Sequence, residues 1–214
     1  DVCTRVLVNP GDVILTSNPS YLGALQSFCS YRADIRGIAH DEDLDVLRRA
    51  YEAEIAKVKA DGKEVKFLYM IPDFQNPSGE SLTLEERKML VDLASRHDFL
   101  IVEDSPYRGL RYEGGHVPTM YSLGPDRVLH LGSFSKIFAP GFRLGWALAH
   151  PDILDKIYVC KQSLDLCPPI FDQYVAAEFL RSGRLDANLS KTIALYRSKR
   201  DLLLSLLEEH MPEN

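Results

Sequence analysis

The chain has 214 residues, 45% of them hydrophobic, and its 25 basic and 31 acidic side chains give a formal net charge of -6. This length is enough for one large domain with a substantial core and too short for several. Acidic residues predominate and no basic run stands out, which argues against nucleic-acid binding by this segment. No apolar run approaches the roughly eighteen residues of a membrane span, so we expect a cytoplasmic protein without a membrane partner.

Four cysteines lack the Cys-x-x-Cys spacing of zinc and redox sites, namely Cys3, Cys29, Cys160 and Cys167. We interpret them as small core residues in a reducing compartment and expect no metal site. The chain starts at Asp1 rather than Met, runs into a strand-like segment, and stops at Asn214 after a long helix. We therefore expect both ends to be cut.

In chain order, the first two thirds predict a strand at 13–16, a helix at 21–30, a strand at 35–39, a helix at 44–59 and a strand at 65–71. Thr83 opens the next helix, because Glu86 three residues later completes a capping box. Short apolar strands at 100–102 and 128–131 follow. After Pro151 the pattern predicts three successive helices at 152–166, 170–182 and 186–210.

Strands that are apolar on both faces and alternate with helices indicate an α/β fold, a three-layer sandwich around a mostly parallel sheet. We expect one domain over residues 1–214, incomplete at its N-terminus, with the last helix leading toward a missing small domain. In such sheets, ligands bind in the loops after the strands. That rule selects three loops, at residues 72–79, 103–109 and 132–145.

The third loop holds a lysine among apolar side chains. Phe134, Ile137 and Phe138 flank Lys136, so we expect a partly desolvated amine. Desolvation disfavours the ammonium form and leaves the amine free to act as a nucleophile or to form an imine. Taken alone, Lys136 fits a surface lysine in a polar turn at least as well.

The same loop carries groups suited to phosphate. Arg143 offers a fixed fork of donors, and Ser133 and Ser135 add hydroxyl donors. Together with Lys136 they suit a phosphorylated aldehyde. A rival interpretation is the Ser-x-x-Lys pattern of penicillin-recognising acyl enzymes, but the accompanying Ser-Asp-Asn and Lys-Thr-Gly motifs do not occur in the chain.

The second loop places an acid at the end of an otherwise apolar strand. A carboxylate at Asp104 is costly there unless it meets a cation, and a pyridinium nitrogen is such a cation. Tyr107, three residues further on, offers a hydroxyl to a ring oxygen. Capping of a helix or turn explains Asp104 equally well when the residue is taken alone.

The first loop contains Gln75-Asn76-Pro77-Ser78-Gly79, which by itself predicts a tight turn. In order along the chain, Asn-Pro-Ser-Gly, Asp-x-x-Tyr, and Ser-x-Ser-Lys with a following Arg closely resemble the pyridoxal-phosphate-dependent class I/II aminotransferases of fold type I. The resemblance is closest to the branch of 2-aminoadipate, kynurenine and aromatic aminotransferases. It extends over essentially the whole chain.

The resemblance implies roles for the cofactor-binding residues. Lys136 resembles the lysine that binds pyridoxal 5'-phosphate as a Schiff base and moves a proton between the substrate Cα and the cofactor. Asp104 resembles the partner of the ring nitrogen. Tyr107 and Asn76 resemble the pair that hydrogen-bonds the phenolic oxygen, and in the family this asparagine also lies beside the substrate carboxylate.

Three further residues resemble the family's phosphate ligands, namely Ser133, Ser135 and Arg143. By the same resemblance, an antiparallel strand is expected at 145–149 after Arg143. The implied reaction is a ping-pong transfer of an amino group from an amino acid to a 2-oxo acid, commonly 2-oxoglutarate. The implied assembly is a homodimer.

Some features of the family are not found in this chain. Its glycine-rich phosphate loop and ring-stacking aromatic residue lie before the first strand, and its substrate-carboxylate arginine lies beyond the last long helix. Lyases, decarboxylases and acyl-transferring synthases of fold type I share the same three loops and stay open as alternatives. So does the aminotransferase-like effector domain of a transcription regulator, which would follow a helix-turn-helix domain.

Overall fold

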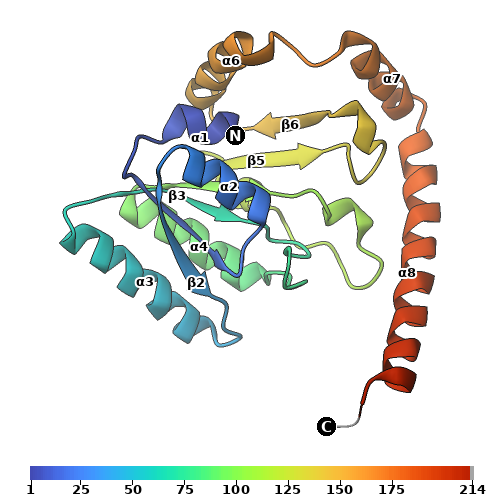
Figure 1. Ribbon diagram of the computed structural model, residues 1–214, viewed down its shortest axis with the longest axis horizontal. Coiled ribbons are helices and arrows are strands. Elements are labelled where there is room, and N and C mark those ends of the chain that lie inside the picture. The colour runs from blue at the N-terminus through green and yellow to red at the C-terminus, as the bar shows by residue number, and fades with distance from the viewer. Residues whose placement is uncertain (213–214) are drawn as a thin grey trace. The chain divides into compact units, whose positions relative to one another are not determined.

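The computed structural model describes residues 1–212 (Figure 1). They fall into two compact units. The first unit comprises Asp1–Ser105, Val117–Gly132 and Gly145–Cys167. The second comprises Pro106–His116, Ser133–Leu144 and the described residues from Pro168 onward. The candidate site residues are therefore distributed over both units.

A six-stranded sheet forms the centre of the first unit, in the order β2-β1-β3-β4-β5-β6. Its strands are β1 (Val13–Asn18), β2 (Asp34–Ala39), β3 (Val65–Met70), β4 (Leu100–Asp104), β5 (Val128–Ser133) and β6 (Gly145–Leu148). The pairings from β2 to β5 are parallel, and β6 runs antiparallel to β5 (Figure 1). This confirms the predicted α/β fold, including the antiparallel strand after Arg143.

Helices cover the sheet because alternate side chains of each strand point to opposite faces. Leu15, Leu68 and Ile101 are fully buried in one core cluster with helices α3 (Leu44–Ala60) and α4 (Leu84–His97). On the other face, Phe28 of α2 (Leu22–Ser30) packs edge-on against Phe67 at 5.6 Å. The strands are therefore buried on both faces, as parallel strands require.

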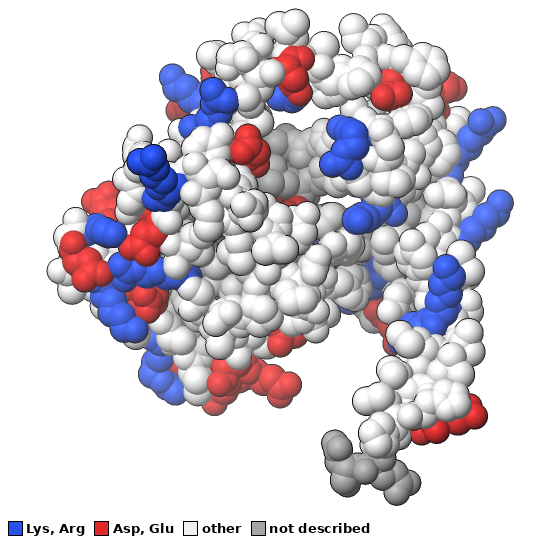
Figure 2. Space-filling model, in the orientation of Figure 1, with Lys and Arg blue, Asp and Glu red and all other residues white. Residues whose placement is uncertain are grey.

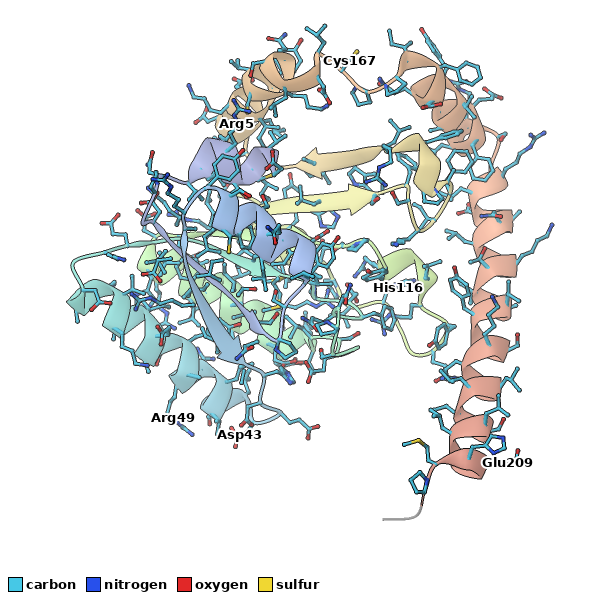
Figure 3. The ribbon with its side chains drawn as sticks, in the orientation of Figure 1. Arg5, Asp43, Arg49, His116, Cys167 and Glu209 are labelled. Carbon is cyan, nitrogen blue, oxygen red and sulfur yellow. The ribbon has the colours of Figure 1, made fainter. Side chains whose placement is uncertain are left out.

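The two helices of the main core begin where their sequences predict. In α3, Leu47, Tyr51, Ile55 and Val58 form the buried stripe, and the Asp43 carboxylate accepts hydrogen bonds from the first-turn amides. Figure 3 shows Asp43 at that end of α3. In α4, Thr83 and Glu86 form the predicted capping box, with a Thr83 N to Glu86 Oε2 distance of 2.6 Å.

Two predictions for the first unit are wrong. The segment expected to be strand-like after Asp1 is a helix, α1 (Val2–Leu7), which packs against α6 (Pro151–Asp165). Its β-branched and apolar residues suit either structure, so tertiary packing decides. The cysteines are not core residues: Cys29 and Cys167 are exposed, and Cys3 and Cys160 are only partly buried. Figure 3 shows Cys167 in the connection after α6.

Several short elements were not predicted. Helix α5 (Met120–Leu123) belongs to the first unit, and two 3₁₀ turns, η1 (Arg108–Leu110) and η2 (Pro140–Phe142), belong to the second. Each has only three or four residues, which is too short for a helical period to show in sequence.

The second unit contains α7 (Ile170–Arg181) and α8 (Arg184–His210). Phe138 stacks on Phe179 of α7 with ring centroids 4.3 Å apart, and Arg200 of α8 pairs with Glu113. Helix α8 has 27 residues and none of them is buried. Its contacts within this unit are therefore peripheral.

Charged side chains of both signs are interspersed over α3 and its neighbourhood (Figure 2). Arg36 of β2, for example, pairs with both Asp34 and Asp61 at 3.1 and 2.7 Å. On the face shown, this region therefore offers no continuous basic track for a phosphate backbone. In the described part of the chain, no helix is both long and apolar enough to cross a bilayer.

Candidate active site

The seven candidate residues divide between the two units. Asn76 and Asp104 belong to the first unit, at the carboxyl ends of the adjacent parallel strands β3 and β4. Both strands therefore direct their following loops to the same edge of the sheet. The other five belong to the second unit, namely Tyr107, Ser133, Ser135, Lys136 and Arg143.

Asp104 is the last residue of β4, and its side chain is largely enclosed. Burial raises the pKa of the Asp104 carboxyl above its ordinary value, while a hydrogen bond from Tyr69 and the charge of His130 act in the opposite direction. The Tyr69 hydroxyl donates to Asp104 Oδ2 at 2.7 Å. Among the described residues, no lysine or arginine forms an ion pair with Asp104, so its charge lacks a full counterion.

The neighbours of Asp104 in sequence have different environments. Glu103 points to the opposite face, where its buried carboxylate accepts the amides of Met120 and Tyr121 and lies 2.9 Å from His130 Nδ1. This carboxylate holds the start of α5 and is satisfied within the first unit. Ser105 Oγ, by contrast, is buried and has no hydrogen-bond partner among the described residues.

The turn that carries Asn76 is fixed by its neighbour Gln75. The Gln75 amide donates to Pro19 O at 2.9 Å and to Ser17 Oγ at 3.2 Å, and its Oε1 accepts the Ser78 amide at 2.7 Å. These bonds tie the turn after β3 to the loop after β1. Asn76 is half-buried in this turn, beside a buried and fully engaged residue.

Lys136 lies near Tyr107 in the second unit, with its Nζ 6.0 Å from the centre of the tyrosine ring. The predicted desolvation of Lys136 is wrong, because the side chain is exposed. Its apolar neighbours pack elsewhere: Phe138 stacks on Phe179, and Ile137 lies against Gly109, where an added Cβ would come within 3.3 Å of Ile137 Cγ2. The amine is accordingly accessible to a ligand.

The expected phosphate ligands cluster in the loop after β5. Ser135 N donates to Ser133 Oγ at 3.1 Å, and Arg143 Nη1 lies 3.4 Å from Ser135 Oγ. Arg143 has a left-handed backbone, with φ of 53°, which a residue other than glycine rarely adopts and which often occurs at functional sites. The loop thus places a guanidinium, two hydroxyls and an amine within ten or so residues of one another.

Sequence patterns did not identify Tyr69, Gln75 or Ser105 as parts of the site. Tyr69 resembles an ordinary strand residue, and its relation to Asp104 depends on the register in which Tyr69 is paired with Val102. Period-two alternation then places Asp104 on the same face as Tyr69. For Tyr69, strand register was therefore the information that the sequence did not supply.

The chain matches the sequence profile described as "Aminotransferase class I and II" over residues 1–213. Among curated proteins, it is 43% identical to aromatic-amino-acid aminotransferase 1 of Thermococcus litoralis, over all of this chain and 51% of that protein. The chain spans about half the length of the curated relatives it matches.

Solved structures agree with this match. Pyrococcus horikoshii kynurenine aminotransferase, in complex with PMP, KYN and KYA, is 40% identical with a TM-score of 0.93, over 100% of this chain and 53% of that one. The α-aminoadipate aminotransferase of Thermus thermophilus, complexed with N-(5'-phosphopyridoxyl)-L-leucine, is 32% identical with a TM-score of 0.87, over 99% of this chain and 54% of that one.

Proposed function

Because the chain belongs to the class I and II aminotransferase family, we propose that the whole protein transfers an amino group between an amino acid and a 2-oxo acid, with pyridoxal 5'-phosphate as cofactor. The observation that carries this proposal is Asp104, an enclosed carboxylate at a strand end without a full counterion. A protonated ring nitrogen supplies the missing positive charge. The two related structures contain PMP and a phosphopyridoxyl adduct, which supports the cofactor.

The residues of the site fit this cofactor by the chemistry of their donors and acceptors. Asp104 would hold the ring nitrogen, and Tyr107 and Asn76 would hydrogen-bond the phenolic oxygen. The remaining ligands, for the phosphate, would be Ser133, Ser135 and Arg143. The unpartnered Ser105 hydroxyl beside Asp104 is a further donor that a ligand would satisfy.

The catalytic work of the chain would centre on Lys136. When bound, pyridoxal phosphate supplies an aldehyde that takes up the amino group and a ring that withdraws electrons from the substrate Cα. Lys136 would bind the cofactor covalently between turnovers and, as a free amine, would accept and return the proton of Cα. Asp104 would keep the ring nitrogen protonated, and Asn76 would orient the substrate carboxylate.

The finer assignments rest on similarity. The names of the relatives point to aromatic amino acids, kynurenine and 2-aminoadipate as donors, and 2-oxoglutarate is the proposed acceptor. We also propose that residues 1–214 form a cofactor-binding domain and that the protein works in the cytoplasm as a homodimer. Exposed aromatic residues such as Phe171 and Tyr174 on α7 are consistent with burial in such an interface.

The cofactor assignment is tested on the full-length protein with Lys136→Ala and, as control, the exposed lysine variant Lys88→Ala. We expect wild type and Lys88→Ala to show a visible absorbance band with pyridoxal phosphate. Borohydride should then fix the cofactor's mass on the peptide that contains Lys136. Lys136→Ala should lose the fixed mass, and attachment to another residue would overturn the assignment.

The reaction is tested separately with a panel of amino acids and 2-oxoglutarate, by measuring glutamate. Formation of glutamate from aromatic amino acids, kynurenine or 2-aminoadipate is the expected result. If the protein binds the cofactor but forms no glutamate from any donor, the aminotransferase proposal fails. Release of carbon dioxide or ammonia would favour another fold type I enzyme, and specific DNA binding would favour the regulator.

A further inference from the structure

Tyr69 and Asp104 form a side-chain pair across neighbouring strands. The Tyr69 hydroxyl donates to Asp104 Oδ2 at 2.7 Å, a short distance that is typical of a hydroxyl bound to a carboxylate. Tyr69 is paired with Val102 in the β3–β4 register, and Asp104 lies two residues beyond Val102. Both side chains therefore project from the same face of the sheet.

The Tyr69 ring is held rigidly. It is only 4% exposed, and Phe28 of α2 packs edge-on against it with ring centroids 5.4 Å apart and an interplanar angle of 74°. Phe28 is itself 4% exposed and contacts Phe67, so the three rings support one another. A donor fixed in this way fixes the rotamer of the carboxylate that accepts its hydrogen bond.

The two carboxylate oxygens of Asp104 differ in their hydrogen bonding. Oδ2 is engaged by Tyr69, while Oδ1 has no hydrogen-bond donor among the residues that the structure describes. Asp104 keeps a partly accessible surface. One oxygen is thus held by the protein and the other is left for a ligand.

A tyrosine hydroxyl suits this task better than a cationic side chain. It stabilises the carboxylate as an acceptor without adding a positive charge that would compete with, or repel, a cationic ring nitrogen. Burial raises the pKa of Asp104; against it, His130 from β5 also favours the charged form, more weakly than Tyr69. Burial raises the pKa of the Cys3 thiol of α1, and the charge of Asp104 adds to this effect.

We propose that Tyr69 is a positioning residue that holds Asp104 charged and in a single orientation, with Oδ1 directed to the ring nitrogen of the cofactor. The proposal builds on the function proposed above, since the ring nitrogen belongs to that cofactor. Tyr69 itself acts through Asp104.

The first experiment needs no cofactor. In the cofactor-free protein, the titration of Asp104 is followed by carboxyl carbon-13 NMR, with the signal assigned by its loss in Asp104→Asn. Tyr69→Phe removes one hydroxyl and should raise the midpoint by about one pH unit, the size expected for one lost hydrogen bond to a charged group. Tyr51→Phe is the matched control, because Tyr51 is 2% exposed and lies in the core on the opposite face.

A second substitution should lower the midpoint of the Asp104 titration instead of raising it. Replacing Tyr69 with 3-fluorotyrosine makes the hydroxyl more acidic and strengthens its hydrogen bond, so the Asp104 midpoint should fall. This variant preserves the donor and the ring packing, which keeps the test informative if Tyr69→Phe folds poorly. An unchanged midpoint in both variants, or an equal shift in Tyr51→Phe, would overturn the proposal.

The second experiment uses pyridoxal phosphate labelled with nitrogen-15 in its ring. In Tyr69→Phe we expect a larger unprotonated fraction at neutral pH than in wild type, and a dissociation constant raised about tenfold, which corresponds to the same one-unit change. A nitrogen signal identical to wild type would contradict the proposal. If wild type binds no cofactor, the proposed function fails, while the titration of Asp104 still reports whether Tyr69 holds it.

Discussion

At the scale of single residues, Asp104 combines two opposing demands. Its enclosure in the first unit disfavours a charge, yet the proposed chemistry needs that charge beside the ring nitrogen. Tyr69 and His130 lessen the conflict without removing it, since the pKa of Asp104 stays raised. The cofactor-free protein therefore carries a carboxylate whose charge is unfavourable where it is buried, and a cationic ligand offsets that cost.

This conflict predicts how stability depends on pH. The folded protein holds the Asp104 proton to a higher pH than the unfolded chain does, so between these two pKa values the folded state binds more protons and loses stability as pH rises. Below the unfolded value of about 4 there is no such loss. Asp104→Asn should therefore stabilise the cofactor-free protein at pH 7, with a gain that shrinks toward pH 4.

Urea unfolding of the wild type and of Asp104→Asn, both without cofactor, at several pH values measures this gain in the free energy of unfolding. Asp43→Asn serves as control, because Asp43 is exposed at the start of α3. In that control the amide still caps the helix, and no gain at pH 7 is expected. An Asp104→Asn variant that is less stable than wild type at pH 7 would mean that Asp104 already has a sufficient partner within the protein.

The sequence nominated the candidate residues, but it could not predict the environment of each side chain. The spacing of Asn76, Asp104 and Lys136 after three strands gave the motif. The exposure of Lys136 was not predictable, because apolar residues adjacent in sequence turn toward α7 and the segment around Gly109 instead. Adjacency in sequence does not fix which way neighbouring side chains pack.

At the scale of elements, a buried ion pair fastens α4 to the segment after β3. Arg87 and Asp73 are both 0% exposed and are joined by two hydrogen bonds, of 3.0 and 3.3 Å. Arg87 also donates to the carbonyls of Pro72 and Leu82. The segment between them contains the Asn76 turn, so Arg87 and Gln75 together hold this turn in place.

Arg87→Met should destabilise the protein by about 3–5 kcal/mol, because it breaks a fully buried ion pair and removes both hydrogen bonds from the guanidinium to the Asp73 carboxylate. The control Arg96→Met removes ion pairs with Asp92 and Glu52 that are largely exposed, and should cost less than about 1 kcal/mol. Urea unfolding measures both. Equal losses of unfolding free energy in the two variants would show that the buried Arg87 pair contributes no more to stability than the exposed pairs of Arg96.

The regular elements were largely predictable because long periodic patterns report on burial. The stripe of α3 and the capping box of α4 are such patterns, and both are confirmed. The buried pair of Arg87 and Asp73 could not be predicted, since charged residues on a helix normally face solvent. Helix α1 was mistaken for a strand because apolar, β-branched segments suit both structures until packing selects one.

At the scale of the whole molecule, the two units differ in how much they bury. Strands β1, β3 and β4 contain residues with no exposed surface, such as Ile14, Leu68 and Ile101. In the second unit, the buried residues of the described chain are Leu144 and Ala176. Stability in the isolated 214-residue chain should accordingly be concentrated in the first unit.

Helix α8 gives the sharpest form of this expectation. It has 27 residues with none buried, its leucines at 202, 203 and 204 are exposed, and an isolated helix is only marginally stable in water. In native-state hydrogen exchange of the 214-residue chain, amides of α8 should exchange with little protection, while those of β1, β3 and β4 exchange only on global unfolding. Dilution should leave this contrast unchanged. Protection of α8 that appears only at high protein concentration would show that a second copy covers its apolar residues. Protection of α8 as strong as that of β3 at every concentration would contradict the division of stability between the units.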